Sequence, residues 1–347
     1  MKNRSIHSDY PLRASSLRLA FTLLLFLVAS HSLDAQVSQH LLRGTPVTYN
    51  QVGPRICIYS EDIQEPVKIF VISDTHLWMS DSREDPYRKY SERMASAYHN
   101  NRHFQTGEPT TSQESFLRTL DLAKQSGADA IALLGDICSY PSEAAIDFVV
   151  SRLDSLGIPY YYTFGNHDWH YEGMEGTEVA LRAEWAQRRY KPLFRDYNPL
   201  IYSVDVKGLR LIMLDTSVYE ILPEQLSIFR QEMKTRKPTL LMSHVPFYAP
   251  GFPPSYGVGH PDWNASTDGN YQVERRPRWP EEGHKTEAFA LWKEVLKAHR
   301  KHKLLASFSG HVHRMSTSVV GPWVQFTTAA NLAGGYYEVT VEPLPNK

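Results

Sequence analysis

Residues 158–168, IPYYYTFGNHD, decide the fold that this sequence predicts. The first seven are mostly β-branched or aromatic, which is typical of a buried strand. The next four, Gly165 to Asp168, are then expected on the loop at the carboxyl end of that strand, where open α/β sheets carry their chemistry. An amide, an imidazole and a carboxylate behind a glycine offer a metal ligand, a proton donor and an orienting group within one turn.

The chain before this stretch repeats a strand and helix pattern. Apolar runs predict buried strands at 67–73 and 129–134. Between the strands, helical spacing predicts one helix that starts in a capping box at Thr111 and ends at Gly127, and a second from 142 to 157. Strands that alternate with helices predict a parallel sheet built from βαβ units.

The chain after this stretch predicts a mixed sheet. Two strands at 201–206 and 209–214 are joined by a short turn, which is typical of a hairpin. Further helices are expected at 178–190, 223–236 and 285–302, and further strands at 239–242, 304–308, 317–320, 323–328 and 336–341.

Three segments lack a clear pattern. Residues 36–66 are polar and broken by glycine and proline, apart from a short strand-like piece at 56–59, and we expect them to form an N-terminal leader on the surface. Residues 77–109 are polar and irregular, which predicts a lid or a mobile flap. Residues 246–283 are rich in proline, glycine and aromatic side chains, and this loop is suited to stacking against a nucleobase or a sugar.

Residues 1–35 have the layout of a secretory signal peptide. Basic residues between Lys2 and Arg18 precede the apolar run 19–29, and a polar segment ends at the small residue Ala35. The run is shorter than the roughly 20 residues that span a bilayer. We expect cleavage after Ala35, which would give a secreted or periplasmic protein without a membrane anchor. The alternative is that the run is an anchor or an internal apolar helix.

The composition excludes several classes of protein. With 347 residues, of which 42% are hydrophobic, the chain can bury a large core. A net charge of −1 gives no indication of a basic surface for binding nucleic acid or anionic lipid. Two cysteines, Cys57 and Cys138, do not make a disulfide scaffold; both are expected as small buried thiols, with a single bridge as the alternative.

Five predicted strands end in side chains that commonly bind metals. If the strands share one sheet, we expect these side chains to converge at its carboxyl edge. Carboxylates, imidazoles and an amide in this number suit two first-row divalent ions about 3.5–4 Å apart, with a carboxylate between them. The residues, in chain order, are Asp74, His76, Asp136, Asn166, His167, His244, His311 and His313.

The ordered motifs Asp-x-His, Gly-Asp, Gly-Asn-His-Asp, His and Gly-His-x-His resemble those of the calcineurin-like metallophosphoesterases, over about residues 67 to 340. The resemblance implies an α/β fold, a four-layer mixed β-sandwich flanked by helices, and a catalytic domain at 67–347. It also implies two metal ions (Mn, Fe or Zn), hydrolysis of a small phosphorylated substrate by a metal-activated water, and a proton donor, His167, oriented by Asp168. The ligands that it implies are Asp74, His76 and His313 for one ion, Asn166, His244 and His311 for the other, and Asp136 for both.

Several alternatives stay open at this stage. Purple acid phosphatases, which resemble this sequence, carry a tyrosine and a glutamate where Ser139 and Asp168 stand here, so a purple iron-tyrosinate site is not expected. The motifs do not distinguish a monoesterase from a diesterase or a pyrophosphatase. The rival hypotheses are a non-catalytic metal-binding interaction module and metals with a purely structural role. The oligomeric state is left open.

Overall fold

Two mixed β-sheets form the centre of the fold. The computed structural model describes residues 37–42, 45–253, 256–262, 286–301 and 303–344, so the predicted signal peptide and most of loop 246–283 lie outside the described residues. One sheet has seven strands in the order β1-β2-β3-β15-β4-β7-β8, and the other has six in the order β13-β14-β12-β11-β10-β9. Their strands are β1 (Val37–Leu42), β2 (Thr45–Val52), β3 (Arg55–Ser60), β4 (Val67–Ile72), β7 (Ala130–Leu133), β8 (Tyr160–Tyr162), β9 (Ile201–Val206), β10 (Leu209–Leu214), β11 (Thr239–Ser243), β12 (Leu304–Ser309), β13 (Ser316–Val320), β14 (Trp323–Thr327) and β15 (Tyr337–Pro343).

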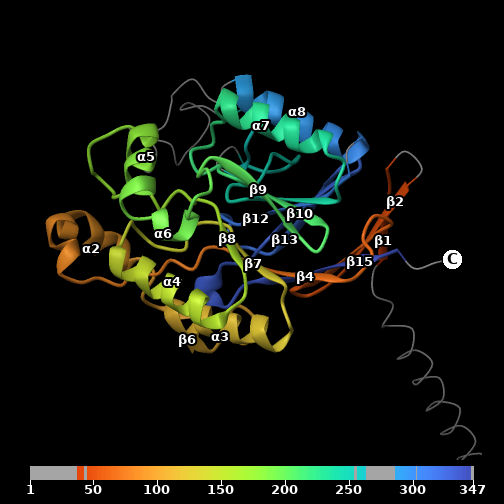
Figure 1. The fold of residues 1–347 in the computed structure, drawn as a ribbon. Helices are drawn as coiled ribbons and strands as arrows, with labels where there is room; N and C mark the ends of the chain where they lie inside the picture. Colours follow the sequence, from red (N-terminus) through yellow and green to blue (C-terminus); the bar gives the residue numbers. More distant parts are fainter. Residues whose placement is uncertain (1–36, 43–44, 254–255, 263–285, 302, 345–347) are drawn as a thin grey trace, which may run out of the picture. The chain divides into compact units, whose positions relative to one another are not determined.

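Helices cover the outer face of each sheet. Figure 1 shows α7 (Pro223–Lys234) and α8 (Thr286–Lys301) above the six-stranded sheet, and α3 (Ser112–Gln125) and α4 (Glu143–Leu156) below the seven-stranded sheet. Two shorter helices, α5 (Glu178–Arg188) and α6 (Lys191–Phe194), lie beside them. The predicted four-layer α/β fold, with a mixed β-sandwich flanked by helices, is therefore confirmed. Among the described residues, no helix is long and apolar enough to cross a membrane.

Local sequence signals explain where several elements begin and end. The predicted capping box of α3 forms, because the Thr111 hydroxyl accepts from the Glu114 backbone N–H while the Glu114 carboxylate accepts from the Thr111 N–H. In the turn between β9 and β10, Lys207 and Gly208 both have positive φ, at 47° and 84°. This conformation suits a tight antiparallel hairpin, and β9 and β10 pair antiparallel as predicted.

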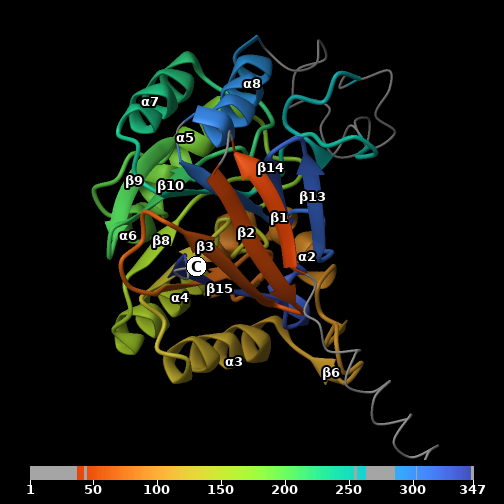
Figure 2. The ribbon, with the colours of Figure 1, turned by 90° about the vertical axis from the view of Figure 1, so that its right-hand side faces the viewer.

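The leader predicted at 36–66 is instead part of the seven-stranded sheet. Strand β3 pairs in parallel with β15 and antiparallel with β2, and Ile56 and Ile58 of β3 are buried. Figure 2 shows β2, β3 and β15 side by side at the front of the fold. The expectation of a surface leader was wrong because the polar alternation in this segment belongs to strands whose apolar side chains face the core.

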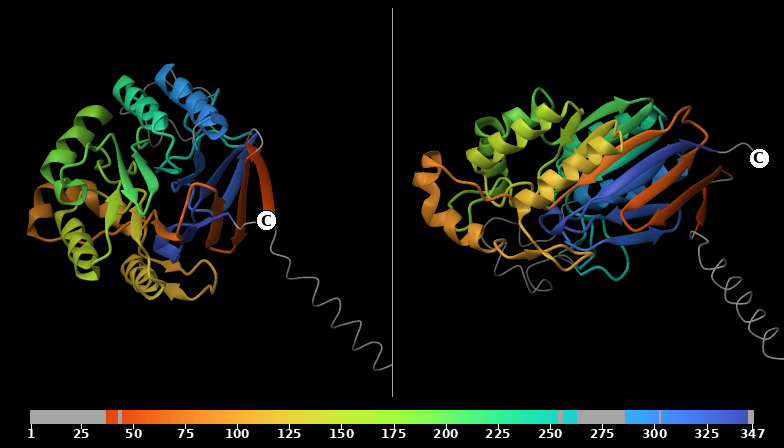
Figure 3. Two further views of the ribbon diagram at one scale, coloured as in Figure 1. Left: turned by 45° about the vertical axis from the view of Figure 1, so that its right-hand side comes forward. Right: turned by 90° about the horizontal axis from the view of Figure 1, so that it is seen from below.

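The irregular segment predicted at 77–109 contains regular structure. It includes a 3₁₀ helix, η1 (Ser82–Tyr87), the helix α2 (Arg88–Ser96) and a two-stranded ribbon of β5 (Asn101–Arg102) and β6 (Pro109–Thr110). Helix α2 is mostly polar and buries only Ser91 and Met94. In Figures 1 and 3, α2 lies at the opposite end of the described fold from β2.

Candidate metal centre

Loops from both sheets bring the predicted ligands together. Asp74 and His76 follow β4, Asp136 follows β7, and Asn166 follows β8, all in the seven-stranded sheet. His244 follows β11, and His311 and His313 follow β12, in the six-stranded sheet. The prediction of a single sheet edge was wrong: each sheet contributes its carboxyl ends, and the loops meet between the sheets. Within each sheet, backbone hydrogen bonds join neighbouring loops, as from His76 N to the Asp136 carbonyl at 2.9 Å and from Gly310 N to the His244 carbonyl at 3.0 Å. Between the sheets, the His311 backbone N–H donates to Asp74 Oδ2 at 2.9 Å.

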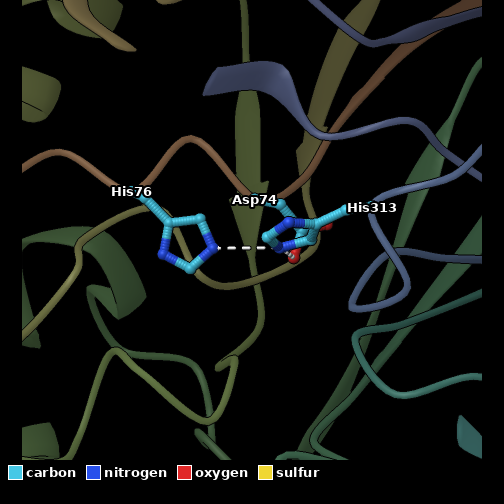
Figure 4. Close-up of side chains that lie close together, drawn as sticks. All are labelled: Asp74, His76 and His313. Carbon is cyan, nitrogen blue, oxygen red and sulfur yellow. Dashed lines mark hydrogen bonds and ion pairs between the residues drawn. The ribbon is translucent and has the colours of Figure 1, made fainter. Parts of the chain in front are cut away.

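One group of candidate ligands consists of Asp74, His76 and His313, whose ligand atoms all lie within 4.8 Å of one another. His76 Nε2 is 3.1 Å from His313 Nε2, and His313 Nε2 is 3.2 Å from Asp74 Oδ1. Figure 4 shows the two imidazole rings directed toward each other, with the Asp74 carboxylate beside His313. Two ring nitrogens and an oxygen that converge in this way can share a cation.

A second group consists of Asp136, His244 and His311, again within 4.8 Å. The His244 Nδ1 lies 2.8 Å from the Leu134 carbonyl, which fixes a proton on that nitrogen. The other ring nitrogen, Nε2, faces two oxygens, Asp136 Oδ2 at 3.2 Å and Asn166 Oδ1 at 3.2 Å. Two acceptor oxygens beside this nitrogen need either a proton on Nε2 or a cation among the three atoms, and the donor set fits a metal ion.

His76 and Asp136 link the two groups. Together with His167 they form a third group that meets the same 4.8 Å limit. Asp136 belongs to two of the three groups, one with His76 and His167 and one with His244 and His311. Asn166 joins through its contact with His244 at 3.2 Å, so all seven predicted ligands lie in one continuous cluster.

Charge in this cluster favours ionised carboxylates. Burial would raise the pKa of Asp74, but the charge of His313 and its hydrogen bond outweigh burial and lower that pKa to about 2. Burial is likewise outweighed at Asp136, chiefly by His244, and its pKa lies well below the usual range. Burial would lower the pKa of His244, but Asp136 raises it to about 9. The buried carboxylates therefore need positive charge next to them, which a metal ion would supply.

The backbone of the cluster is strained. Five of the ten non-glycine residues with positive φ in the described part of the chain are candidate ligands. Each such conformation costs on the order of 1–3 kcal/mol and persists only where the surroundings enforce it, which is common at functional sites. The residues and their φ values are Asp74 (56°), His76 (49°), Asp136 (50°), His311 (67°) and His313 (57°).

Two glycines allow the close approach of these loops. A Cβ atom on Gly165 would overlap the backbone N and the carboxylate of Asp136. A Cβ atom on Gly310 would overlap Ser73 Oγ and the carboxylate of Asp74. The Gly-Asn-His-Asp and Gly-His-x-His motifs therefore need glycine at these positions, because no room is left beside the two carboxylates for a larger side chain.

His167 lies in the third group, next to the predicted ligands His76 and Asp136, but its contacts differ from the prediction. Its Nδ1 is 3.3 Å from the Ser139 carbonyl, and its backbone N–H donates to Asp136 Oδ1 at 2.8 Å. The ring meets His76 edge-on, with ring centroids 4.8 Å apart. The Ser139 carbonyl and the backbone, both absent from the prediction, hold this histidine.

Asp168 was predicted to orient His167, and its hydrogen bonds show a different role. Its fully buried carboxylate accepts from the backbone N–H groups of Asp136 at 2.8 Å, Gly165 at 2.8 Å and Cys138 at 2.9 Å. Burial and the charge of Asp136 raise the pKa of Asp168 to about 7, which the backbone donors counter only in part. Asp168 thus joins the loops after β7 and β8, and it acts on His167 only through the backbone that both share.

Two tyrosines next to the cluster were not predicted. The Tyr98 ring is stacked on His76, with centroids 4.0 Å apart and planes at 19°. The Tyr219 hydroxyl is 2.5 Å from His311 Nε2. Tyr219 also has a positive φ of 62°. No sequence signal separates these two from the other tyrosines among the 20 in the chain.

The two cysteines do not form a disulfide in the described structure. Cys138 is buried and Cys57 is half-buried. Burial raises the pKa of the Cys138 thiol well above its usual range, so it has little thiolate character. Cys138 supports the cluster through its backbone N–H, which donates to Asp168.

The protein-family model described as "Calcineurin-like phosphoesterase" matches residues 67–315. The chain belongs to this family. It is therefore a member of a family of metal-dependent phosphoesterases, as its motifs predicted. No curated protein matches the sequence.

Solved structures similar to this calcineurin-like phosphoesterase include a dimetal phosphatase from Danio rerio, with a TM-score of 0.44 and 12% identity, covering 78% of this chain and 89% of that chain. Another is the purple acid phosphatase PPD1 from yellow lupin seeds, with a TM-score of 0.46 and 13% identity, covering 89% and 51%. A third is GAP50, the anchor in the inner membrane complex of Plasmodium, with a TM-score of 0.38 and 11% identity, covering 76% and 71%.

A buried ionic network attaches η1 to the rest of this phosphoesterase. Arg189 packs against the rings of Tyr87 and Trp185, which meet edge-on, with its guanidinium carbon 4.7 Å and 4.6 Å from their centroids. The guanidinium contacts Glu84 Oε2 at 3.4 Å and the Tyr171 hydroxyl at 2.6 Å. The Arg189 and Glu84 side chains are 1% and 3% exposed, so solvent does not screen this pair.

We expect Arg189→Met to lower the free energy of unfolding by about 3–5 kcal/mol, because the buried Glu84 carboxylate loses its positive partner and keeps only the hydrogen bond from the Tyr171 hydroxyl. Urea unfolding followed by circular dichroism measures the change. Adding Glu84→Gln to this variant should recover part of the loss, since it removes the unpaired charge. A loss below about 1 kcal/mol for Arg189→Met would show that the network does not stabilise the fold.

Proposed function

We propose that this protein hydrolyses phosphate esters with a pair of metal ions and with His167 as the proton donor. The observation that supports the proposal is the linked set of ligand groups. Asp136 belongs to the group with His76 and His167 and to the group with His244 and His311, and all ligand atoms of a group lie within 4.8 Å. The proposed ligands are Asp74, His76 and His313 for one ion, Asn166, His244 and His311 for the other, with Asp136 shared by both.

The donor types support a pair of first-row ions. Imidazole nitrogen mixed with carboxylate and amide oxygen suits Mn, Fe or Zn. When bound, such a pair neutralises the charge of a phosphate ester and lowers the pKa of water enough to supply hydroxide at neutral pH. The strained and buried ligand loops hold the donors in place before the ions arrive, which limits reorganisation on binding.

His167 is suited to deliver a proton to the leaving oxygen. A proton on Nδ1 directed at the Ser139 carbonyl fixes the ring and leaves Nε2 as the transferring atom. The hydrogen bond from the His167 backbone N–H to Asp136 Oδ1 keeps the ring next to the shared ligand. In-line attack places the leaving oxygen on the side of the phosphorus away from the nucleophile. A proton donor is therefore needed on that side, next to the ligand groups.

Removal of metal tests this function directly. We expect chelation with EDTA to lower hydrolysis of mono- or bis-nitrophenyl phosphate at least about 100-fold, and Mn²⁺ to restore it. The preferred reporter would identify a monoesterase or a diesterase. Full activity after the metals are removed would contradict the proposal. Two bound metals without turnover of either reporter would favour a non-catalytic metal-binding module.

We also propose a small phosphorylated substrate and export from the cytoplasm. The net charge of −1 argues against a nucleic-acid partner, and the apolar run 19–29 argues for a cleaved signal. Sequencing the amino terminus of the protein expressed in its host tests export, with cleavage after Ala35 as the expected result.

A further inference from the structure

A pocket of about 390 Å³ opens next to His167. One wall is the carboxyl-terminal part of α2 with the residues after it, and the other is the stretch that follows the Gly-Asn-His-Asp motif. The size lies at the lower end of the range for small-molecule sites, which is enough for one ring system. The residues that line it are Arg93, Met94, Ser96, Ala97, Tyr98, Asn166, His167, His170 and Glu172.

The pocket is continuous with the candidate reaction centre. Asn166 and His167, which belong to the proposed centre, form part of its wall. Tyr98 separates the pocket from the ligand His76, because its ring is stacked on His76 at 4.0 Å and meets His167 edge-on at 5.9 Å. A group attached to the oxygen that His167 protonates would therefore extend into this pocket.

The lining carries little net charge. Among the lining residues, the carboxylate of Glu172 and the guanidinium of Arg93 pair with each other, since Arg93 Nε donates to Glu172 Oε2 at 2.6 Å. Met94 is buried, and Ala97 and the Tyr98 ring add apolar surface. A second phosphate would find no unpaired arginine or lysine among these lining residues, whereas an uncharged flat ring can stack on Tyr98.

We propose that this pocket binds the leaving group of the substrate and selects an uncharged aromatic alcohol over a small aliphatic one. The inference rests on the proposed function, because the leaving-group side is defined by His167 as proton donor. It makes α2, Tyr98 and the residues between them the part of the chain that determines specificity.

The substitution Ala97→Trp tests this by filling the pocket. Ala97 is exposed, so the larger side chain can be accommodated without disturbing the core. We expect the ratio of kcat/KM for a 2-naphthyl ester to that for an ethyl ester to fall at least about tenfold, which corresponds to about 1.4 kcal/mol. Each ester is compared between variant and unaltered protein, so differences in intrinsic reactivity cancel.

Glu92→Trp is the matched control, because Glu92 is exposed on α2, which ends just before Ala97, and does not line the pocket. It should leave the ratio unchanged. An equal loss for both esters in Ala97→Trp, or no loss for either, would overturn the proposal.

A binding measurement separates failure of this inference from failure of the proposed function. Calorimetric titration of the metal-free protein with 2-naphthol should show saturable binding that Ala97→Trp weakens at least about tenfold. If the unaltered protein hydrolyses no ester, the proposed function fails. This titration alone then shows whether the pocket binds an aromatic alcohol. Absence of saturable 2-naphthol binding would then overturn the inference as well.

Discussion

Replacing His167 with alanine is expected to lower kcat at least about 100-fold while both metals remain bound. A positioned proton donor contributes typically 10²–10⁴-fold, and none of the proposed ligand roles belongs to His167. The loss should be larger for phenyl phosphate than for nitrophenyl phosphate, because a poorer leaving group depends more on protonation. Steady-state kinetics on both esters, with metal content by mass spectrometry, measure the effect.

His170→Ala is the control for this variant. His170 lines the same pocket and lies three residues further along the loop, but it belongs to none of the three ligand groups. We expect its kcat to stay within about tenfold of the unaltered protein. Equal losses in the two variants, or release of a metal from His167→Ala, would show that His167 does not act as the proton donor.

The substitution Asp136→Asn is expected to remove at least one metal and to lower kcat/KM more than about 1,000-fold. Asparagine keeps the shape of the side chain but removes the charge that two ligand groups share. It also weakens the hydrogen bond from the His167 backbone N–H to Asp136 Oδ1, so the donor and the ligands are disturbed together. Metal stoichiometry and kcat/KM on the preferred nitrophenyl ester measure the two effects.

Asp215→Asn is the matched control. Asp215 also follows a strand, β10, and is fully buried, but it pairs with Arg182 at 3.1 Å and lies in none of the ligand groups. We expect this variant to be less stable and to keep its metals. If Asp136→Asn kept two metals and more than a tenth of its activity, a shared ligand at this position would be ruled out.

The elements that could be predicted from sequence are those specified by neighbouring residues. The capping box at Thr111 and Glu114 and the hairpin turn at Lys207 depend on a few adjacent residues, and both form as predicted. Strand β3 could not be assigned to the sheet in this way, because its neighbour β15 lies more than 270 residues later in the chain. Helix α2 was missed because most of its residues are polar and only two of them are buried, so its sequence lacks the apolar stripe of a core helix.

The candidate site was likewise predictable only where neighbouring residues specify it. Short motifs at strand ends identified every residue of the three ligand groups. A motif at the end of a strand has the same sequence pattern whichever sheet the strand joins, so the division of the ligands between two sheets could not be predicted. The Asp168 contacts are to backbone N–H groups of two loops, and the Tyr98 stacking arises from packing of the 77–109 segment. Such contacts follow from the folded arrangement and leave no pattern in the sequence.

The meeting of two sheets at the ligand cluster has a thermodynamic consequence. Two of the three ligand groups combine loops from both sheets, so an ion bound by either group would cross-link the halves of the sandwich. Binding to the folded chain alone adds RT ln(1 + [L]/Kd) to its stability, about 2.7 kcal/mol when the free ion is at 100 times Kd. The resistance of this protein to unfolding would then rise and fall with the metal supply of its surroundings, together with its activity.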